Sequence, residues 1–240
     1  MRVVVSIGGS VLAPELDPER VAAYADALER LAGAGCEPGV VVGGGGVARE
    51  YISTARELGA NEVELDELGI GTTRLNARLL IAAIGNAAAP SPATGYDEAA
   101  AALRRGETPV MGGMTPGQTT DAVAAALAES VDADLLVFAT SADGVYDVDP
   151  NRYDDATRFE TLTPAELVDV VLPMSRDAGA SAPVDLLAAK LIDRAGIRSV
   201  VLDGTDPGAV VDAVLDGDHT GTEVVPEGNV EPVEWTGGDE

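Results

Sequence analysis

The chain has 240 residues, of which 46% are hydrophobic, so it can bury a sizeable core as one large α/β domain or two closely joined lobes. Lys and Arg together number 15 against 41 Asp and Glu, and the resulting formal net charge of −26 repels nucleic acid and anionic lipid. A single cysteine, Cys36, and a single histidine, His219, exclude an intrachain disulfide, a Ser-His-Asp triad and a zinc site built on histidines.

Lysine is almost absent from the chain. Lys190 is the only lysine, and the other 14 basic residues are arginines. Acid excess with so little lysine is typical of proteins from cells that accumulate molar salt, which screens charges within ~3 Å. The N-terminal stretch lacks the pattern of a signal peptide, and no apolar run approaches the ~20 residues of a membrane span. We therefore expect a cytoplasmic protein of a halophile, with no nucleic-acid or membrane partner.

Short β-branched apolar runs alternate along the chain with Ala- and Leu-rich stretches that carry acids on one side. The runs predict strands at residues 3–7, 40–42, 109–111, 135–139 and 199–202. The stretches predict helices at residues 18–34, 47–58, 68–86, 97–105, 120–131, 164–170, 184–195 and 207–215. Fully apolar strands alternating with helices predict a three-layer α/β/α sandwich with a mostly parallel central sheet.

Two regions depart from this alternation. Residues 144–159 are polar and rich in turn signals, which predicts an irregular loop or hairpin projecting from the sheet. Residues 227–240 are rich in Pro, Gly and Glu, which predicts an acidic flexible tail. With no long linker in between, residues 1–226 are expected to form a single domain.

Glycine-rich turns follow the first two predicted strands. Gly8, Gly9 and Ser10 follow the first, and residues 43–46 are four glycines that follow the second and open a helix. Such a turn lets backbone N–H groups and a helix N-terminus approach a phosphate, and Arg49 lies one turn into that helix. Because open α/β sheets bind ligands at this edge, the two turns predict one phosphate site.

The phosphate-binding motifs that are present or absent in the chain restrict the class of ligand that the turns could bind. No G-x-x-x-x-G-K-[ST] is present, because the only lysine is at position 190, so the chain is not a P-loop protein. Residues 43–48 satisfy G-x-G-x-x-[GA], and Glu62, Glu64 and Asp66 follow about 20 residues on. A dinucleotide-binding dehydrogenase therefore remains open at this point.

An ordered series of short motifs resembles the uridylate kinases of archaea. The series comprises IGGS at 7–10, GGGGVAR at 43–49, DELGI at 66–70, MGG through TTD at 111–121, ADGVY with DP at 142–150, and D-x-LAAK at 185–190. The resemblance runs from about residue 1 to 226 in the family's order and spacing. It implies the amino-acid-kinase fold and transfer of the γ-phosphate of ATP to UMP in pyrimidine biosynthesis. It also implies Mg²⁺ bound mainly through the nucleotide, and a homo-oligomer, by this likeness a hexamer.

The same resemblance assigns residues to roles, with residues up to about 130 binding the acceptor and residues 131–226 binding ATP. The residues implied for ATP are Gly9, Ser10, Gly45, Arg49, Thr140, Tyr146 and Asp149. Those implied for UMP are Gly44, Asp66, Met114, Thr115, Pro116, Gly117, Gln118, Thr119 and Thr120. The catalytic set it implies is Arg49, Lys190, Asp121 and Asp185, with no metal site made by protein alone.

Several alternatives stay open. Asp66 could be only a helix cap, and Tyr146 could simply pack the hairpin against the sheet. Ser6 stands where many members of the wider fold have lysine, and Ser141-Ala142 stands where relatives have Asn-Val. The rival functions are another small-molecule kinase of the same fold, such as isopentenyl phosphate or acetylglutamate kinase, or a non-catalytic nucleotide-binding sensor or storage protein.

Overall fold

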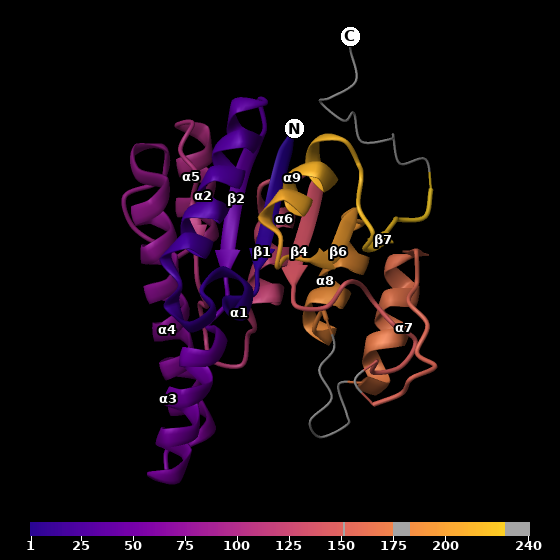
Figure 1. Ribbon diagram of the computed structural model, residues 1–240, viewed down its shortest axis with the longest axis horizontal. Coiled ribbons are helices and arrows are strands. Elements are labelled where there is room, and N and C mark those ends of the chain that lie inside the picture. Colours follow the sequence, from indigo (N-terminus) through magenta and orange to yellow (C-terminus); the bar gives the residue numbers. More distant parts are fainter. Residues whose placement is uncertain (151, 175–182, 229–240) are drawn as a thin grey trace.

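The protein is built on one central sheet of seven strands, shown in Figure 1. The computed structural model describes residues 1–150, 152–174 and 183–228. The strands are β1 (Arg2–Ile7), β2 (Glu37–Val42), β3 (Val110–Met111), β4 (Leu135–Thr140), β5 (Thr161–Leu162), β6 (Ser199–Asp203) and β7 (Thr222–Val224). Their order is β3-β2-β1-β4-β6-β7-β5, and only the β6–β7 pair is antiparallel.

Helices cover both faces of this sheet. They are α1 (Gly9–Leu12), α2 (Pro18–Gly33), α3 (Gly45–Glu57), α4 (Glu62–Ile84), α5 (Tyr96–Arg104), α6 (Thr120–Ser130), α7 (Pro164–Met174), α8 (Leu186–Ala195) and α9 (Pro207–Leu215). Helices α2, α4 and α9 pack in one hydrophobic cluster, and α5 to α8 pack in the other. The predicted three-layer α/β/α sandwich with a mostly parallel sheet is confirmed.

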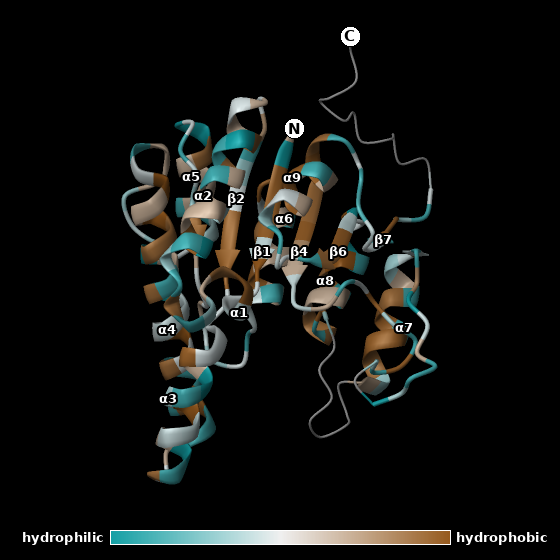
Figure 2. Ribbon diagram, viewed as in Figure 1, coloured by the Kyte–Doolittle hydropathy of each residue, from teal (hydrophilic) through white to brown (hydrophobic). Residues whose placement is uncertain are grey.

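Strand β1 shows why the apolar runs are continuous rather than alternating. Val3, Val5 and Ile7 belong to the cluster under α2 and α9, whereas Val4 belongs to the cluster under α6 and α8. All four side chains are fully buried, and burying each stabilises the fold by roughly 1.5–3 kcal/mol. Figure 2 shows hydrophobic residues along β1, β2 and β4 between the helical layers.

Local signals in the sequence explain several helix starts. Asp17 caps α2 by accepting a hydrogen bond from the Glu19 N–H, and Asp206 caps α9 in the same way. Helix α4 begins at Glu62, six residues before the predicted start, because Asn61 and Glu64 form a capping box. The Asn61 side chain accepts from the N–H groups of Val63 and Glu64 at 3.1 and 3.2 Å.

All the predicted strands and helices are present, with boundary differences. The 3-10 helix at Pro14–Leu16 was not predicted, and neither were three other short elements. These are α1, β5 and β7, each of two to four residues. The hairpin at residues 144–159 is confirmed by the antiparallel bridge between Tyr146 and Arg158. Of the predicted acidic tail, residues 229–240 lie outside the described residues. Among the helices that the structure describes, none is long and apolar enough to cross a membrane.

The chain reverses its direction of winding at the centre of the sheet. From β1 it proceeds to β2 and β3 on one side, and then returns to β4 on the other side of β1. Figure 1 shows α3 and part of α4 projecting beyond the carboxyl ends of these strands. In open α/β sheets ligands bind at the carboxyl edge where the winding reverses. A ligand site is therefore expected at the turns after β1, β2 and β4.

Candidate active site

Two pockets open at this edge of the sheet and share part of their walls. One, of about 640 Å³, lies over the ends of β1 and β4 and is called the β1–β4 pocket. The other, of about 470 Å³, lies beside α4 and is called the α4 pocket. Both pockets are lined by the same four residues, Gly44, Gly45, Arg49 and Thr120. We call these four residues the junction.

The β1–β4 pocket is floored by closely packed glycine turns. A Cβ atom on Gly9 would lie 2.2 Å from the Gly45 nitrogen, so only glycine lets the two turns approach each other. Ser10 follows in α1, and Thr140, Tyr146 and Asp149 also line this pocket. The Tyr146 hydroxyl donates a hydrogen bond to Asp143 at 2.9 Å. All seven residues predicted for ATP therefore line this pocket.

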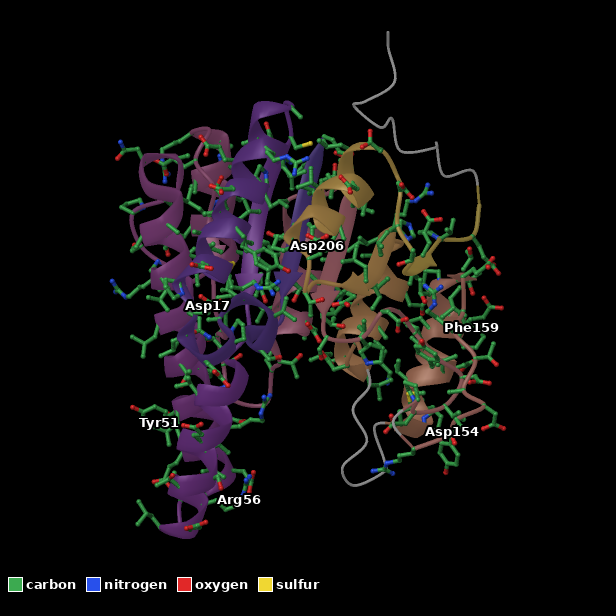
Figure 3. All side chains as sticks on the ribbon, viewed as in Figure 1. Asp17, Tyr51, Arg56, Asp154, Phe159 and Asp206 are labelled. Carbon is green, nitrogen blue, oxygen red and sulfur yellow. The ribbon has the colours of Figure 1, made fainter. Side chains whose placement is uncertain are left out.

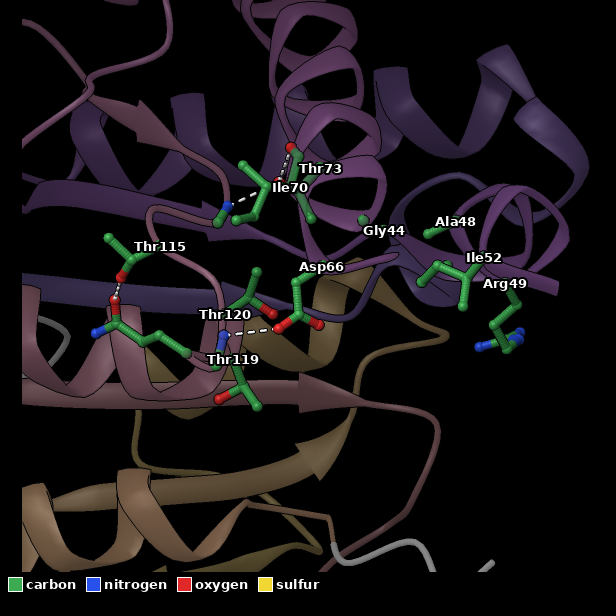
Figure 4. Close-up of a pocket in the computed structure, with 15 residues that line it drawn as sticks. Gly44, Ala48, Arg49, Ile52, Asp66, Ile70, Thr73, Thr115, Thr119 and Thr120 are labelled. Carbon is green, nitrogen blue, oxygen red and sulfur yellow. Dashed lines mark hydrogen bonds between the residues drawn. The ribbon is translucent and has the colours of Figure 1, made fainter. Parts of the chain in front are cut away.

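The α4 pocket is formed between α4 and the segment that precedes α6. Asp66 accepts a hydrogen bond from the Gly117 N–H at 2.7 Å, as Figure 4 shows. Within the same segment the Thr115 hydroxyl donates to the Gln118 side chain at 3.1 Å. Because Asp66 lies inside α4 and Asn61 caps that helix, the alternative that Asp66 is a helix cap is wrong.

Seven of the nine residues predicted for UMP line the α4 pocket. Met114 and Pro116 belong to the same segment but line neither pocket, and Met114 packs partly against the core. Ile70 and Thr73 also line this pocket and were not predicted from the sequence as site residues. The Thr73 hydroxyl donates to the Ile70 carbonyl and accepts from the Gly113 N–H, each at 2.7 Å. Their spacing of four and seven residues from Asp66 is that of one helical face, a signal that a correct helix start would have revealed.

Of the two acidic residues predicted for catalysis, Asp121 lines the β1–β4 pocket and Asp185 does not. The Ser6 hydroxyl donates a hydrogen bond to Asp121 at 3.0 Å. Asp185 caps α8 by accepting from the N–H groups of Leu187 and Ala188, and it also accepts from the Thr119 hydroxyl. Burial first, and then the charge of Asp185, raise the pKa of Asp121 to about 7, against the opposing effect of the Ser6 hydrogen bond.

This raised pKa makes stability depend on pH. Between the ordinary carboxyl pKa of ~4 and about 7, folded Asp121 holds a proton that the unfolded chain releases, so stability falls as pH rises through that window. We expect Asp121→Asn to raise the free energy of unfolding at about pH 8, by roughly 1.4 kcal/mol for each pH unit in which the two states differ by a full proton. Denaturant unfolding from about pH 5 to pH 8 checks this, and a gain that does not grow with pH would refute the assignment.

Lys190, the second cation of the predicted catalytic set, lies on helix α8. It is exposed on the second turn of α8 and lines neither pocket, although the N-terminus of α8 at Asp185 adjoins Thr119. Its catalytic role stays a prediction. Asp185 also lines neither pocket, but it accepts a hydrogen bond from the hydroxyl of Thr119, two residues before Asp121.

A divalent cation fits the chemistry of the acidic pair. Within the described ranges, no group of three or more His, Cys, Asp or Glu could hold a metal ion by itself. Asp121 and Asp185 nevertheless supply carboxylate oxygens, the ligand type that Mg²⁺ prefers. Burial first, and then the charge of Asp185, raise the pKa of Asp121, so positive charge nearby would stabilise its ionised form.

Two pockets that share glycines and an arginine in their walls, on an open α/β sheet without a P-loop, are what an enzyme that transfers phosphate between two ligands requires. Comparison with known proteins agrees with this class. The model of the amino acid kinase family matches residues 1–203. The chain belongs to the amino acid kinase family.

Within this family, the chain is similar over nearly its whole length to several uridylate kinases. The chain is 82% identical to a uridylate kinase from Halorubrum lacusprofundi, over 99% of this chain and 98% of the relative. It is 64% identical to a uridylate kinase from Halobacterium salinarum, over 95% of each. The crystal structure of uridylate kinase from Archaeoglobus fulgidus is 42% identical, with a TM-score of 0.83 over 94% of this chain and all of that one. The predicted resemblance to archaeal uridylate kinases of halophiles is confirmed.

The alternative that the chain is a dinucleotide-binding dehydrogenase is wrong, because both the structure and the family contradict it. Glu62, Glu64 and Asp66 all lie within α4, so none of them ends a strand where a dinucleotide ribose would bind. The chain also belongs to the amino acid kinase family, whose model matches residues 1–203.

Proposed function

We propose that this chain transfers the γ-phosphate of ATP to UMP, giving ADP and UDP, as a step of pyrimidine nucleotide biosynthesis in the cytoplasm. The observation that carries the proposal is the junction, because two phosphate-bearing ligands in the two pockets would meet there. The names of the relatives support UMP as the acceptor.

ATP is assigned to the β1–β4 pocket. Gly9 and Ser10 would bind its phosphates through backbone N–H groups, since α1 begins at Gly9. Thr140, Tyr146 and Asp149 would line the adenosine. The Asp149 carboxylate is close to Arg152, 3.4 Å from its guanidinium, and it can also accept a hydrogen bond from the nucleotide.

UMP is assigned to the α4 pocket, with its phosphate at Gly44. One oxygen of Asp66 holds the Gly117 N–H, so the other is available to the ribose hydroxyls. The hydroxyls of Thr115, Thr119 and Thr120 and the Gln118 amide would bind the uridine and its phosphate. In this proposal residues 1–226 form one domain, with acceptor binding up to about residue 130 and ATP binding beyond it.

Transfer needs positioning and positive charge, because an oxygen of the UMP phosphate attacks another polyanion in line. An ionised phosphate needs no strong base, so this chain's residues mainly hold and neutralise the reactants. Arg49 would stabilise the transferring group at the junction, with Lys190 as a second cation. Mg²⁺ carried by ATP would add positive charge at the phosphates, and Asp121 and Asp185 would orient it or its bound water.

An acceptor panel tests the function. ADP formation would be measured in molar KCl with Mg-ATP and UMP, CMP, dTMP, AMP, isopentenyl phosphate, N-acetylglutamate or carbamate. We expect kcat/KM for UMP to exceed that for each other acceptor by at least about tenfold. Preference for another acceptor would discard the UMP assignment. Absence of turnover with all of them, in folded protein that binds ATP, would favour the sensor or storage alternative.

We further propose a homo-oligomer, with a hexamer expected from the family, that uses the outer face of α4. Leu68, Leu75 and Leu79 lie on one face of that helix and are 37%, 60% and 43% exposed. We expect Leu75→Asp to dissociate the assembly by placing a charge in an apolar contact. Light scattering after gel filtration in molar KCl gives the mass, and Leu187→Asp on α8 is the control, since Leu187 is also exposed at 44%. An unchanged mass for Leu75→Asp would exclude this face.

A further inference from the structure

Asn76 is a buried polar residue that lines neither pocket but contacts the junction from behind. It lies in the middle of α4, and only 3% of it is exposed. Its side-chain nitrogen Nδ2 donates hydrogen bonds to the carbonyl oxygens of Gly43, at 2.8 Å, and Gly44, at 3.3 Å. A buried amide costs stability unless it is bonded, and these two carbonyls provide the bonds that keep it there.

The two bonds determine the direction of two peptide groups. The chain has no cis peptide bond among the described residues. In a trans peptide the C=O and the following N–H point in opposite directions. Because the carbonyls of Gly43 and Gly44 point to Asn76, the N–H groups of Gly44 and Gly45 point away from it. Gly44 and Gly45 are junction residues, so their N–H groups are directed away from α4 at the point where the pockets meet.

The glycine turn needs such a restraint. Gly45 has a φ of 65°, a left-handed conformation in which glycine has many neighbouring alternatives. On the strand side the turn is held by the Gly43 N–H, which donates to the Ile7 carbonyl at 2.9 Å. Beyond Gly43, the Gly44 carbonyl also accepts from the Ala48 N–H of α3, at 3.4 Å. Within the described structure, Asn76 is the side chain that bonds the Gly43 and Gly44 carbonyls together.

We propose that Asn76 is a positioning residue for phosphoryl transfer, which holds the Gly44 and Gly45 N–H groups aimed at the transferring phosphate. This inference rests on the proposed transfer at the junction. Donors that are already oriented stabilise charge in the transition state without reorganising during the reaction. A turn that can rotate its peptides would lose that advantage even where the fold and the substrate pockets are kept.

The test replaces Asn76 by Leu and by Asp, and uses Thr72→Val as a matched control. Thr72 is equally buried in α4, but its hydroxyl donates only to Leu68 of the same helix, at 2.9 Å. We expect N76L to lower kcat about 10- to 100-fold, with the KM for UMP changed less than about threefold. ATP affinity, measured by calorimetry without UMP, should fall about 3- to 10-fold. T72V should leave all three quantities close to wild type.

The pH profile of N76D separates positioning from general support of the fold. An ionised carboxylate cannot donate to the two carbonyls, whereas its protonated form keeps one O–H donor. Burial raises the pKa of such a carboxyl, so the activity of N76D relative to wild type should recover as pH falls, and that of N76L should not. Wild-type kcat and ATP affinity in folded N76L, or losses matched by T72V, would overturn the proposal. If wild type turned over no acceptor, the proposed function would fail, and ATP affinity alone would decide the role of Asn76.

Discussion

Arg49→Gln is expected to lower kcat by about 10²- to 10³-fold while the protein stays folded. Arg49 lies one turn into α3 and lines both pockets, and it forms no ion pair with any residue that the structure describes. Its guanidinium is exposed, so removing its charge costs the fold little, whereas the transferring phosphoryl group would lose a cation.

Arg56→Gln is the matched control for this change. Arg56 lies in the last turn of the same helix, where its exposed guanidinium is 3.2 Å from Glu62, and Figure 3 shows it at the far end of α3. Such surface ion pairs contribute about 0–1 kcal/mol, so this variant should keep wild-type kinetics. Steady-state rates with varied ATP and UMP give the comparison. A kcat for Arg49→Gln within threefold of wild type would remove Arg49 from the mechanism.

Asp66→Asn is expected to lower kcat/KM for UMP by about 10- to 100-fold and to leave the KM for ATP unchanged. Asparagine has the same shape and can still accept from the Gly117 N–H, so the segment before α6 should stay in place. What is lost is the negative charge that strengthens hydrogen bonds to the ribose hydroxyls. Glu67→Gln changes the next, exposed acid of α4 and serves as the control.

A deoxyribose acceptor, dUMP, tests whether Asp66 binds the ribose hydroxyls directly. If Asp66 binds the ribose hydroxyls, wild type should prefer UMP to dUMP, and Asp66→Asn should reduce that preference, because the lost contact cannot discriminate. Equal loss of kcat/KM with both acceptors would instead mean that Asp66 acts only by holding Gly117.

The junction could be foreseen because its signals are local. Glycine turns after apolar strands predict close backbone approach to a phosphate, and the structure indeed brings Gly9 against Gly45. The position of Arg49 near this turn follows from its spacing of one helical turn alone. The strands β5 and β7 could not be foreseen in this way, because each is only two or three residues long and exists through pairing with distant strands.

Only part of the α4 pocket was predicted from the sequence, because the start of the helix was placed wrongly. Taking the helix to begin at residue 68 left Asp66 in a loop and hid the face that it shares with Ile70 and Thr73. The Asn61-x-x-Glu64 capping box was present in the sequence and would have corrected the start. Asn76 carries no local signal of its role, because its partners are carbonyls of a turn more than thirty residues away.

One binding measurement tests whether the two pockets meet at the junction. The ligand is adenosine joined to uridine through a pentaphosphate, titrated calorimetrically in molar KCl against ATP and UMP as references. The end-to-end arrangement predicts one molecule per chain, bound at least about 10²-fold more tightly than either nucleotide, with most of that gain lost in Arg49→Gln. Affinity no greater than that of ATP, or a site left open to UMP in the saturated complex, would contradict it.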